Sequence, residues 1–295
     1  MTDFNTKYGY TPNSEVMDAN LQKISAASAE LASESVLKSC FSMMDLTTLR
    51  TNDTAESVAA LVNKVGAYAK EYPQYPLPAS ICVYSNFAKV VAAGRITPDL
   101  HTTCVSACFP SSQSFLEVKL LECAMAVKDG ADEIDVVLPL NTFLAGDYDA
   151  VREELRAIRK TIDEAAQGRK ITFKVILETG ILSKPQLIAN ASFLAMEEGA
   201  DFIKTSTGKV EINATPMAAY VMCECIKAYF AKTGRKVGFK PAGGVSTAAE
   251  AVGYYAIVKS ILGPDWLNKD LLRFGVSRLA NNLLSAIEQK TVSIF

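Results

Sequence analysis

Short, almost continuously apolar runs alternate along the chain with longer stretches in which apolar residues recur every three or four positions. Eight runs are of the first kind: CFSMMDL, ASICVYS, TTCVSACF, DEIDVVL, ITFKVILE, DFIKTS, KVGFKPA and LLRFGVS. Such runs, short and rich in β-branched residues, are typical of strands covered on both faces. The longer stretches, such as YDAVREELRAIRKTIDEAA, predict amphipathic helices. Strand followed by helix, repeated, predicts a parallel sheet.

Eight such units in roughly 250 residues favour a closed (β/α)₈ barrel of the TIM type over an open sheet. We expect a single α/β domain with an N-terminal helical extension. Residues 1 to about 14 are predicted to form a loose arm, and Ser14 to Lys38 a helix. The predicted division is therefore an arm and helix over 1–37 and a catalytic barrel with a C-terminal tail over 38–295.

Composition narrows the function. The 30 basic and 32 acidic side chains give a net charge of −2, so no global field attracts nucleic acid or an anionic membrane. No apolar run is long enough for a membrane span or a signal peptide, which predicts a cytoplasmic protein. The seven scattered cysteines suggest reduced thiols. The single histidine, His101, lies in a turn-like stretch, where we expect a loop role, and we expect no metal site.

Polar residues inside or at the ends of the apolar runs are candidates for catalysis, because the active site of a barrel forms where its strands end. Lys174, Lys204 and Lys240 lie in the fifth, sixth and seventh runs. A single strand lysine is usually ion-paired or extends its ammonium to solvent. Three on consecutive strands would crowd positive charge into a partly desolvated cavity and lower the pKa of a lysine. Such an amine can form a Schiff base.

Two carboxylates accompany the lysines. Asp135 lies in the fourth run and Asp45 ends the first. Schiff-base chemistry needs an acid or base to move protons, and Asp135 can serve directly or through a water. The alternative is that both aspartates only neutralise the buried lysines.

The loops after the sixth, seventh and eighth runs read TSTGK, PAGGVST and RFGVSR, so each has glycine near a hydroxyl or a cation. Glycines let backbone N–H groups approach an anion, and the start of a following helix adds its dipole. This region of a barrel is a recurrent phosphate site. Together the three loops predict a phosphate cradle.

The segments ADFIKTSTGKV, VGFKPAGGV, DEIDVV, KVILETG, MDLTTL and RFGVS closely resemble deoxyribose-phosphate aldolases, over about residues 38 to 285. The resemblance implies reversible cleavage of 2-deoxyribose 5-phosphate to glyceraldehyde 3-phosphate and acetaldehyde, without a cofactor. It implies Lys204 as the Schiff-base lysine, Lys240 as the cation that lowers its pKa, and Asp135 as the proton relay. The resemblance also implies residues that line the pocket or support it, namely Asp45, Thr47, Cys82, Lys174 and Thr205. The residues that it implies for phosphate binding are Gly208, Lys209, Gly243, Gly244, Gly275 and Ser277.

Two positions depart from the family pattern. Arg278 replaces a second serine of the last loop, and the chain ends in Phe295 where many members have a tyrosine. We interpret Arg278 as an added phosphate contact, with an exposed helix arginine as the alternative.

The alternative functions are a related lysine-dependent barrel aldolase for another phosphorylated sugar and a non-catalytic sugar-phosphate-binding barrel. The expected partners are small phosphorylated sugars and aldehydes, with neither nucleic acid nor membrane, and a homodimer is the candidate assembly.

Overall fold

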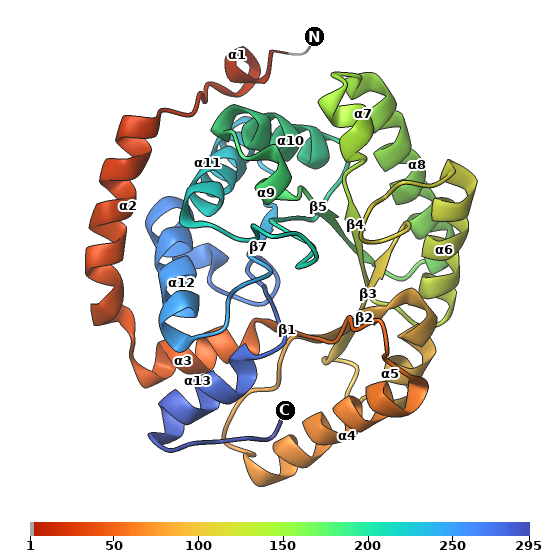
Figure 1. The fold of residues 1–295 in the computed structure, drawn as a ribbon, viewed down its shortest axis with the longest axis vertical. Helices are drawn as coiled ribbons and strands as arrows, with labels where there is room; N and C mark the ends of the chain where they lie inside the picture. The colour runs from red at the N-terminus through yellow and green to blue at the C-terminus, as the bar shows by residue number, and fades with distance from the viewer. Residues whose placement is uncertain (1–2) are drawn as a thin grey trace.

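The computed structural model describes residues 3–295 and confirms a (β/α)₈ barrel (Figure 1). All neighbouring strands are parallel, in the order β7-β6-β5-β4-β3-β2-β1-β8. Bridges from Phe239 to Leu272 and from Ala242 to Gly275 join β7 to β8 and close the ring. The strands are β1 (Met44–Thr47), β2 (Ser80–Tyr84), β3 (His101–Ser106), β4 (Glu133–Val137), β5 (Thr172–Ile176), β6 (Phe202–Lys204), β7 (Gly238–Lys240) and β8 (Phe274–Val276).

One main helix follows each strand and covers the outside of the barrel (Figure 1). In order these helices are α4 (Ala55–Glu71), α5 (Ala88–Gly94), α6 (Leu116–Lys128), α8 (Tyr148–Ala166), α10 (Pro185–Glu197), α11 (Pro216–Thr233), α12 (Ala248–Leu262) and α13 (Leu279–Glu288). The short helices α7 (Leu140–Leu144), α9 (Thr179–Leu182), η2 (Ser85–Phe87) and η3 (Pro264–Trp266) lie in the connections.

Local sequence explains where the helices begin and which face they bury. Thr54 and Thr247 each start a helix with a capping box, in which side chain and backbone satisfy each other's free groups. In α8 the buried residues Val151, Leu155 and Ile158 recur at helical spacing. Each buried side chain of this kind stabilises the fold by about 1.5–3 kcal/mol. Among residues 3–295, no helix has both the length and the apolar character that crossing a bilayer requires.

The N-terminal region differs from the prediction of a loose arm. It contains a helix, α1 (Phe4–Tyr8), whose two aromatic residues are buried. The Tyr8 ring stacks on Phe193 of α10 with 4.3 Å between centroids, and its hydroxyl donates to Glu197 at 2.7 Å. The sequence MTDFNTKYGY is polar on average. Its packing was not predicted, because the two buried aromatic residues, Phe4 and Tyr8, are too few to form a recognisable apolar pattern.

The single helix predicted over residues 14 to 38 was also wrong. The chain forms α2 (Ser14–Ser28), η1 (Ala29–Leu31) and α3 (Glu34–Ser42), and Ser33 caps the start of α3 through the N–H of Val36. In Figure 1, α2 runs along the outside of α11 and α12. Helix α3 continues into the first apolar run, so β1 begins only at Met44, and it crosses the proposed division at 37/38, which stays a prediction.

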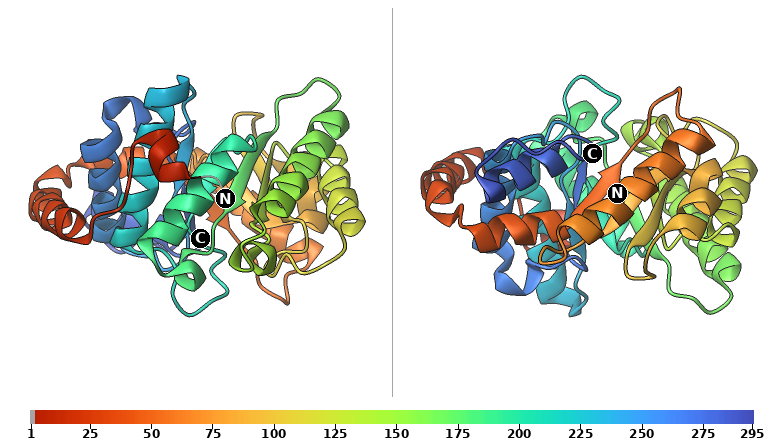
Figure 2. Two further views of the ribbon diagram at one scale, coloured as in Figure 1. Left: turned by 90° about the horizontal axis from the view of Figure 1, so that it is seen from above. Right: turned by 90° about the horizontal axis from the view of Figure 1, so that it is seen from below.

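The C-terminal segment folds back onto the barrel (Figure 2). The side chain of Asn281 in α13 accepts hydrogen bonds from the N–H groups of Ile294 and Phe295 and donates one to a backbone oxygen of Phe295. The Phe295 ring packs at a tilt against Tyr68, with 5.6 Å between centroids. The end of the chain therefore has a fixed place beside α4.

Candidate active site

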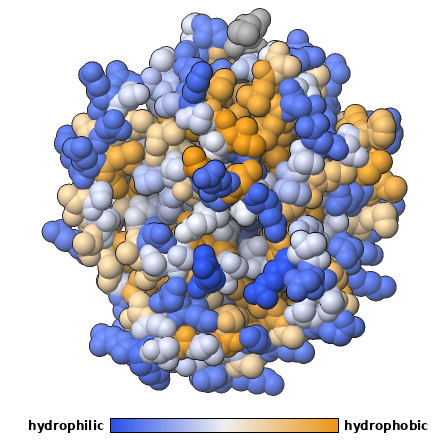
Figure 3. Space-filling view, viewed as in Figure 1, coloured by the Kyte–Doolittle hydropathy of each residue, from blue (hydrophilic) through white to orange (hydrophobic). Residues whose placement is uncertain are grey.

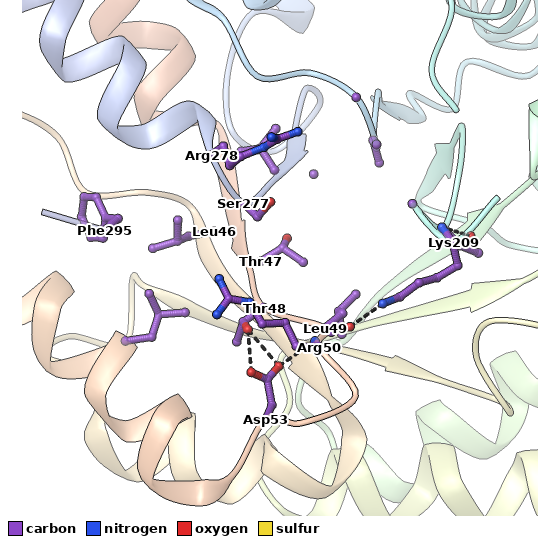
Figure 4. A pocket seen from close by; sticks show the side chains of 18 of the residues that line it. Leu46, Thr47, Thr48, Leu49, Arg50, Asp53, Lys209, Ser277, Arg278 and Phe295 are labelled. Atoms are coloured by element: carbon purple, nitrogen blue, oxygen red, sulfur yellow. Dashed lines mark hydrogen bonds between the residues drawn. The ribbon is translucent and has the colours of Figure 1, made fainter. Parts of the chain in front are cut away.

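A cavity of about 640 Å³ opens where the strands end. Figure 3 shows this face of the molecule, with hydrophilic side chains around its middle. The cavity is lined by residues of β1, β6 and β8, by the loops that follow β1, β6, β7 and β8, by helix α4 and by Phe295 (Figure 4). Of the residues proposed from the sequence, the lining includes Thr47, Lys204, Gly208, Lys209, Gly243, Gly244, Gly275, Ser277 and Arg278.

The three lysines point into the barrel and meet at one carboxylate. Asp135 Oδ2 accepts from Lys204 Nζ at 2.9 Å and from Lys240 Nζ at 2.8 Å, and Oδ1 accepts from Lys174 Nζ at 2.8 Å. The strand register produces this meeting, because Lys204 lies opposite Lys240 and Asp135 opposite Lys174. Lys174 is level with Phe202, two residues before Lys204, so it lies deeper than the other two lysines. Of the three, only Lys204 reaches the cavity wall.

Two further charged groups, which the sequence analysis did not single out, complete a buried network. Arg273 Nη1 contacts Asp45 Oδ1 at 2.6 Å, and its Nη2 contacts Glu133 Oε1 at 2.7 Å. Asp45 also pairs with Lys240, and Glu133 with Lys174. Glu133 precedes Asp135 by two residues and Arg273 precedes Gly275 by two, so strand alternation could have placed both inside the barrel.

The buried network holds one more cation than it has carboxylates. Four cations (Lys174, Lys204, Lys240 and Arg273) face three carboxylates (Asp45, Glu133 and Asp135), and all are at most 3% exposed. Neutrality therefore needs only three of the cations, since a surplus buried charge is costly.

The pKa shifts agree with this count. Burial lowers the pKa of Lys204 below that of an ordinary lysine, Asp135 opposes the shift, and the Lys240 ammonium adds to it. For Lys240 burial also acts downward, but Asp135 and Asp45 outweigh it and raise its pKa. Burial alone would raise the pKa of Asp135, yet the lysines hold it well below its usual range. The site thus pairs an amine that deprotonates easily with an ionised carboxylate.

The remaining supporting residues lie around the network. The Thr47 hydroxyl donates to the carbonyl of Asp45 at 2.7 Å. Thr205 ties β6 to β7 through two hydrogen bonds with Ala242. Cys82 is buried on β2 opposite Thr47, burial raises the pKa of its thiol, and it does not line the cavity. The resemblance placed this thiol in the pocket, whereas the structure buries it, close enough to the lysine network for Lys240 to affect its pKa.

The glycine loops form one side of the cavity. Gly243 has a φ of 78° and lies so close to Asn213 that a Cβ would come within 2.7 Å of its side chain. At Gly275 a Cβ would lie 2.7 Å from Ala242 and 3.1 Å from Lys240 Cε. Both positions therefore require glycine, and they leave backbone exposed to the cavity beside the start of α13, where a helix favours anions.

The opposite wall comes from the loop after β1 and from α4, and the sequence analysis missed it. Asp53 accepts from the Thr48 hydroxyl and the Arg50 N–H, which fixes this loop (Figure 4). Lys209 Nζ reaches across the cavity to the carbonyl of Leu49 (Figure 4). The remaining lining residues of this wall are Ser57, Ala60, Leu61 and Lys64. The polar residues of this wall follow β1 by several positions, so they were not among the residues considered at the ends of the strands.

Another carboxylate that the sequence analysis missed holds the loop after β6. Glu178 is buried at the end of β5, in a left-handed conformation with φ of 54°. It accepts from the Thr207 hydroxyl at 2.6 Å and from the Thr207 N–H at 3.1 Å. Because Thr207 precedes Gly208 and Lys209, this carboxylate sets the path of the loop along the cavity.

His101 is not in a loop, contrary to the prediction. It is the first residue of β3, and its Nδ1 lies 2.7 Å from Glu133 Oε1. The prediction failed because the partner of the ring, Glu133, is 32 residues away in sequence, so the residues around His101 do not reveal it.

Comparison with known proteins agrees with this chemistry. The sequence pattern of the DeoC/LacD family aldolases matches residues 40–260. A candidate deoxyribose-phosphate aldolase of Caenorhabditis elegans is 38% identical over 279 residues, covering 93% of this chain and 89% of that protein.

Solved structures share the fold. A candidate deoxyribose-phosphate aldolase from Toxoplasma gondii superimposes with a TM-score of 0.73 at 22% identity, covering 87% of this chain and 95% of that one. The tetrameric deoxyribose phosphate aldolase from Aeropyrum pernix gives 0.66 at 24% identity, covering 93% and 98%. The resemblance seen in the sequence is thus confirmed, and the chain belongs to the DeoC/LacD family of aldolases.

Proposed function

We propose that this aldolase cleaves 2-deoxy-D-ribose 5-phosphate reversibly to D-glyceraldehyde 3-phosphate and acetaldehyde through a Schiff base on Lys204. The observation that carries the proposal is that Lys204 alone among the buried cations reaches the cavity, with a lowered pKa. The deoxyribose-phosphate aldolases among the relatives support the choice of substrate.

The chemistry follows from the positions of the groups. The neutral Lys204 amine adds to the C1 aldehyde, and loss of water from the carbinolamine leaves an iminium ion, which withdraws electrons from C2. The C2–C3 bond then breaks as a base removes the C3 hydroxyl proton, and its electron pair becomes the enamine. Glyceraldehyde 3-phosphate leaves, the enamine takes a proton at C2, and water releases acetaldehyde and the free lysine.

The surrounding residues divide the remaining roles. Asp135 lies 2.9 Å from the reacting amine, so we assign it the proton transfers, made directly or through a water. Lys240 and Lys174 keep Asp135 ionised, and Lys240 disfavours an ammonium on Lys204. The phosphate is assigned to backbone and hydroxyl donors at Gly208, Gly243, Gly244, Gly275 and Ser277, with Lys209 as the counter-charge.

Reductive trapping tests the nucleophile. Incubation with acetaldehyde and sodium borohydride should add an ethyl group to Lys204 at near-neutral pH, located by peptide mass spectrometry, with loss of cleavage activity. Lys204→Leu should take up no adduct at the site. Labelling of Lys174 or Lys240 with Lys204 unmodified would contradict the assignment, and cleavage of other phosphorylated sugars in preference to the deoxy sugar would contradict the substrate.

Arg278 gives a smaller prediction. It lines the cavity next to Ser277, at the start of α13, with its side chain exposed (Figure 4). A guanidinium here can add a charge-assisted bond to the phosphate. Arg278→Ser should raise KM for the 5-phosphate by roughly 5- to 20-fold with little change in kcat, since one such bond contributes about 1–2 kcal/mol. An unchanged KM would assign Arg278 to the solvent face of the helix.

We retain the homodimer as a proposal. Helix α6 exposes Val118, Leu121 and Met125 at helical spacing, with Phe115 before them, and this apolar stripe supports burial against another surface. A cytoplasmic location stays a prediction.

A further inference from the structure

His101 lies at the opposite end of the barrel from the cavity. It begins β3, whereas Lys204 ends β6, and in a parallel barrel the two ends of the strands form opposite faces. Its side chain is 32% exposed, while Glu133, which it contacts, is fully buried. His101 is therefore the point where solvent meets the buried network on the face away from the substrate.

A continuous series of contacts joins this histidine to the reactive amine. Glu133 contacts His101 Nδ1 through Oε1, at 2.7 Å, and Lys174 through Oε2. Lys174 Nζ lies 2.8 Å from Asp135 Oδ1, and Asp135 Oδ2 lies 2.9 Å from Lys204 Nζ. Three buried groups thus separate the only histidine from the proposed nucleophile.

The charge count couples the two ends. Three carboxylates neutralise Lys174, Lys240 and Arg273, which leaves the network without net charge when both ends are unprotonated. A proton on either His101 or Lys204 then gives the buried network one surplus positive charge. A second proton, at the other end, binds less readily because the network is already positive.

We propose that protonation of His101 and protonation of Lys204 oppose each other through the buried network, which makes His101 a positioning residue for the aldolase reaction. The inference rests on the proposed role of Lys204 as the reacting amine. Its consequence is that an imidazolium on the far face keeps Lys204 unprotonated, and therefore reactive, at lower pH.

The other charged groups near His101 have partners of their own. Asp99, two residues earlier, forms an ion pair with Lys269, which lowers its pKa more than His101 does. Arg273 contacts Glu133 beside the histidine and also donates to the carbonyl of Lys269. On β2, Ser80 pairs with His101 in the sheet register and is uncharged. Among residues 3–295, Glu133 is the only ionised group that forms a hydrogen bond or an ion pair with the ring.

Two substitutions with opposite expected effects test the inference. In His101→Gln the charge is lost, so Lys204 gains its proton at higher pH and the ascending limb of the kcat/KM profile should move up by about half a pH unit. In His101→Lys the charge is permanent, so the limb should move down by about as much. The kcat on the plateau should change little in either, and Lys227→Gln, which removes an exposed cation on α11, should leave the limb in place.

A measurement without turnover separates this inference from the proposed function. Because the chain has one histidine, its imidazole signal in NMR needs no assignment. Linkage is reciprocal, so Lys204→Met should raise the midpoint of that titration by about the same half unit. Equal midpoints in wild type and Lys204→Met, or limbs that move in the same direction in both His101 variants, would overturn the coupling. If the midpoint shifts in Lys204→Met but the wild-type protein has no aldolase activity, the coupling is upheld and the proposed function is refuted.

Discussion

Asp135→Asn should slow the exchange of deuterium from solvent into acetaldehyde by about 10²- to 10⁴-fold, the usual worth of a positioned acid or base. Exchange requires proton removal at the carbon next to the iminium carbon, and Asp135 is the only carboxylate in contact with Lys204 within residues 3–295. Asparagine keeps the shape of the side chain but takes up no proton. Exchange followed by proton NMR gives the rate.

The variant should still form the Schiff base. Loss of the carboxylate removes a group that raises the pKa of Lys204, so the amine should stay available for borohydride trapping. Trapping without exchange would separate proton transfer from nucleophilic attack. Deletion of residues 290–295 is the comparison: Phe295 lines the cavity but has no hydroxyl, so exchange should change little. A large loss on deletion, or rapid exchange in Asp135→Asn, would contradict the assignment to Asp135.

Arg273→Met should lower the free energy of unfolding at pH 7 by about 3–5 kcal/mol, as expected when one partner of a buried ion pair is removed. Arg273 is 2% exposed and contacts both Asp45 and Glu133, so methionine would leave two buried carboxylates with one counter-charge fewer. Urea unfolding followed by circular dichroism measures the loss.

The pH dependence checks the cause of that loss. Burial alone would raise the pKa of Glu133, but Arg273 and Lys174 outweigh it and hold that pKa below its usual range. A carboxylate with a depressed pKa stabilises the fold above its unfolded pKa, and the contribution disappears as pH falls. The difference between wild type and Arg273→Met should therefore narrow below about pH 4. Arg156→Met, which changes an exposed arginine of α8, should cost little. A constant difference at all pH values would assign the loss to packing.

The fold followed from the sequence because strand length and helical spacing are local properties. Each of the eight apolar runs overlaps an observed strand, and helices such as α8 begin and end where their apolar spacing does. The N-terminal region did not follow, because Phe4 and Tyr8 owe their burial to α10, far away in sequence. A pattern of two aromatic residues in a polar stretch does not identify its partner.

The candidate site was predictable in part for the same reason. Lys174, Lys204 and Lys240 are conspicuous because a lysine is rare inside a strand. Glu133 and Arg273 were missed because they lie near the amino ends of their strands, whereas the catalytic groups of a barrel are expected at the carboxyl ends. The contact between His101 and Glu133 depends on the register of β3 against β4, which the sequence does not reveal.

The positive charges around the opening of the cavity have a kinetic consequence. Arg50, Lys64, Lys209 and Arg278 are all exposed around the opening, whereas the whole chain carries a net charge of −2. A phosphorylated sugar therefore meets weak repulsion at long range and a positive rim as it approaches. At 0.15 M ionic strength charges are screened over about 8 Å, so the rim guides only the last stage of the encounter. Added salt should therefore slow association with the phosphate ester while leaving the capture of neutral acetaldehyde unaffected.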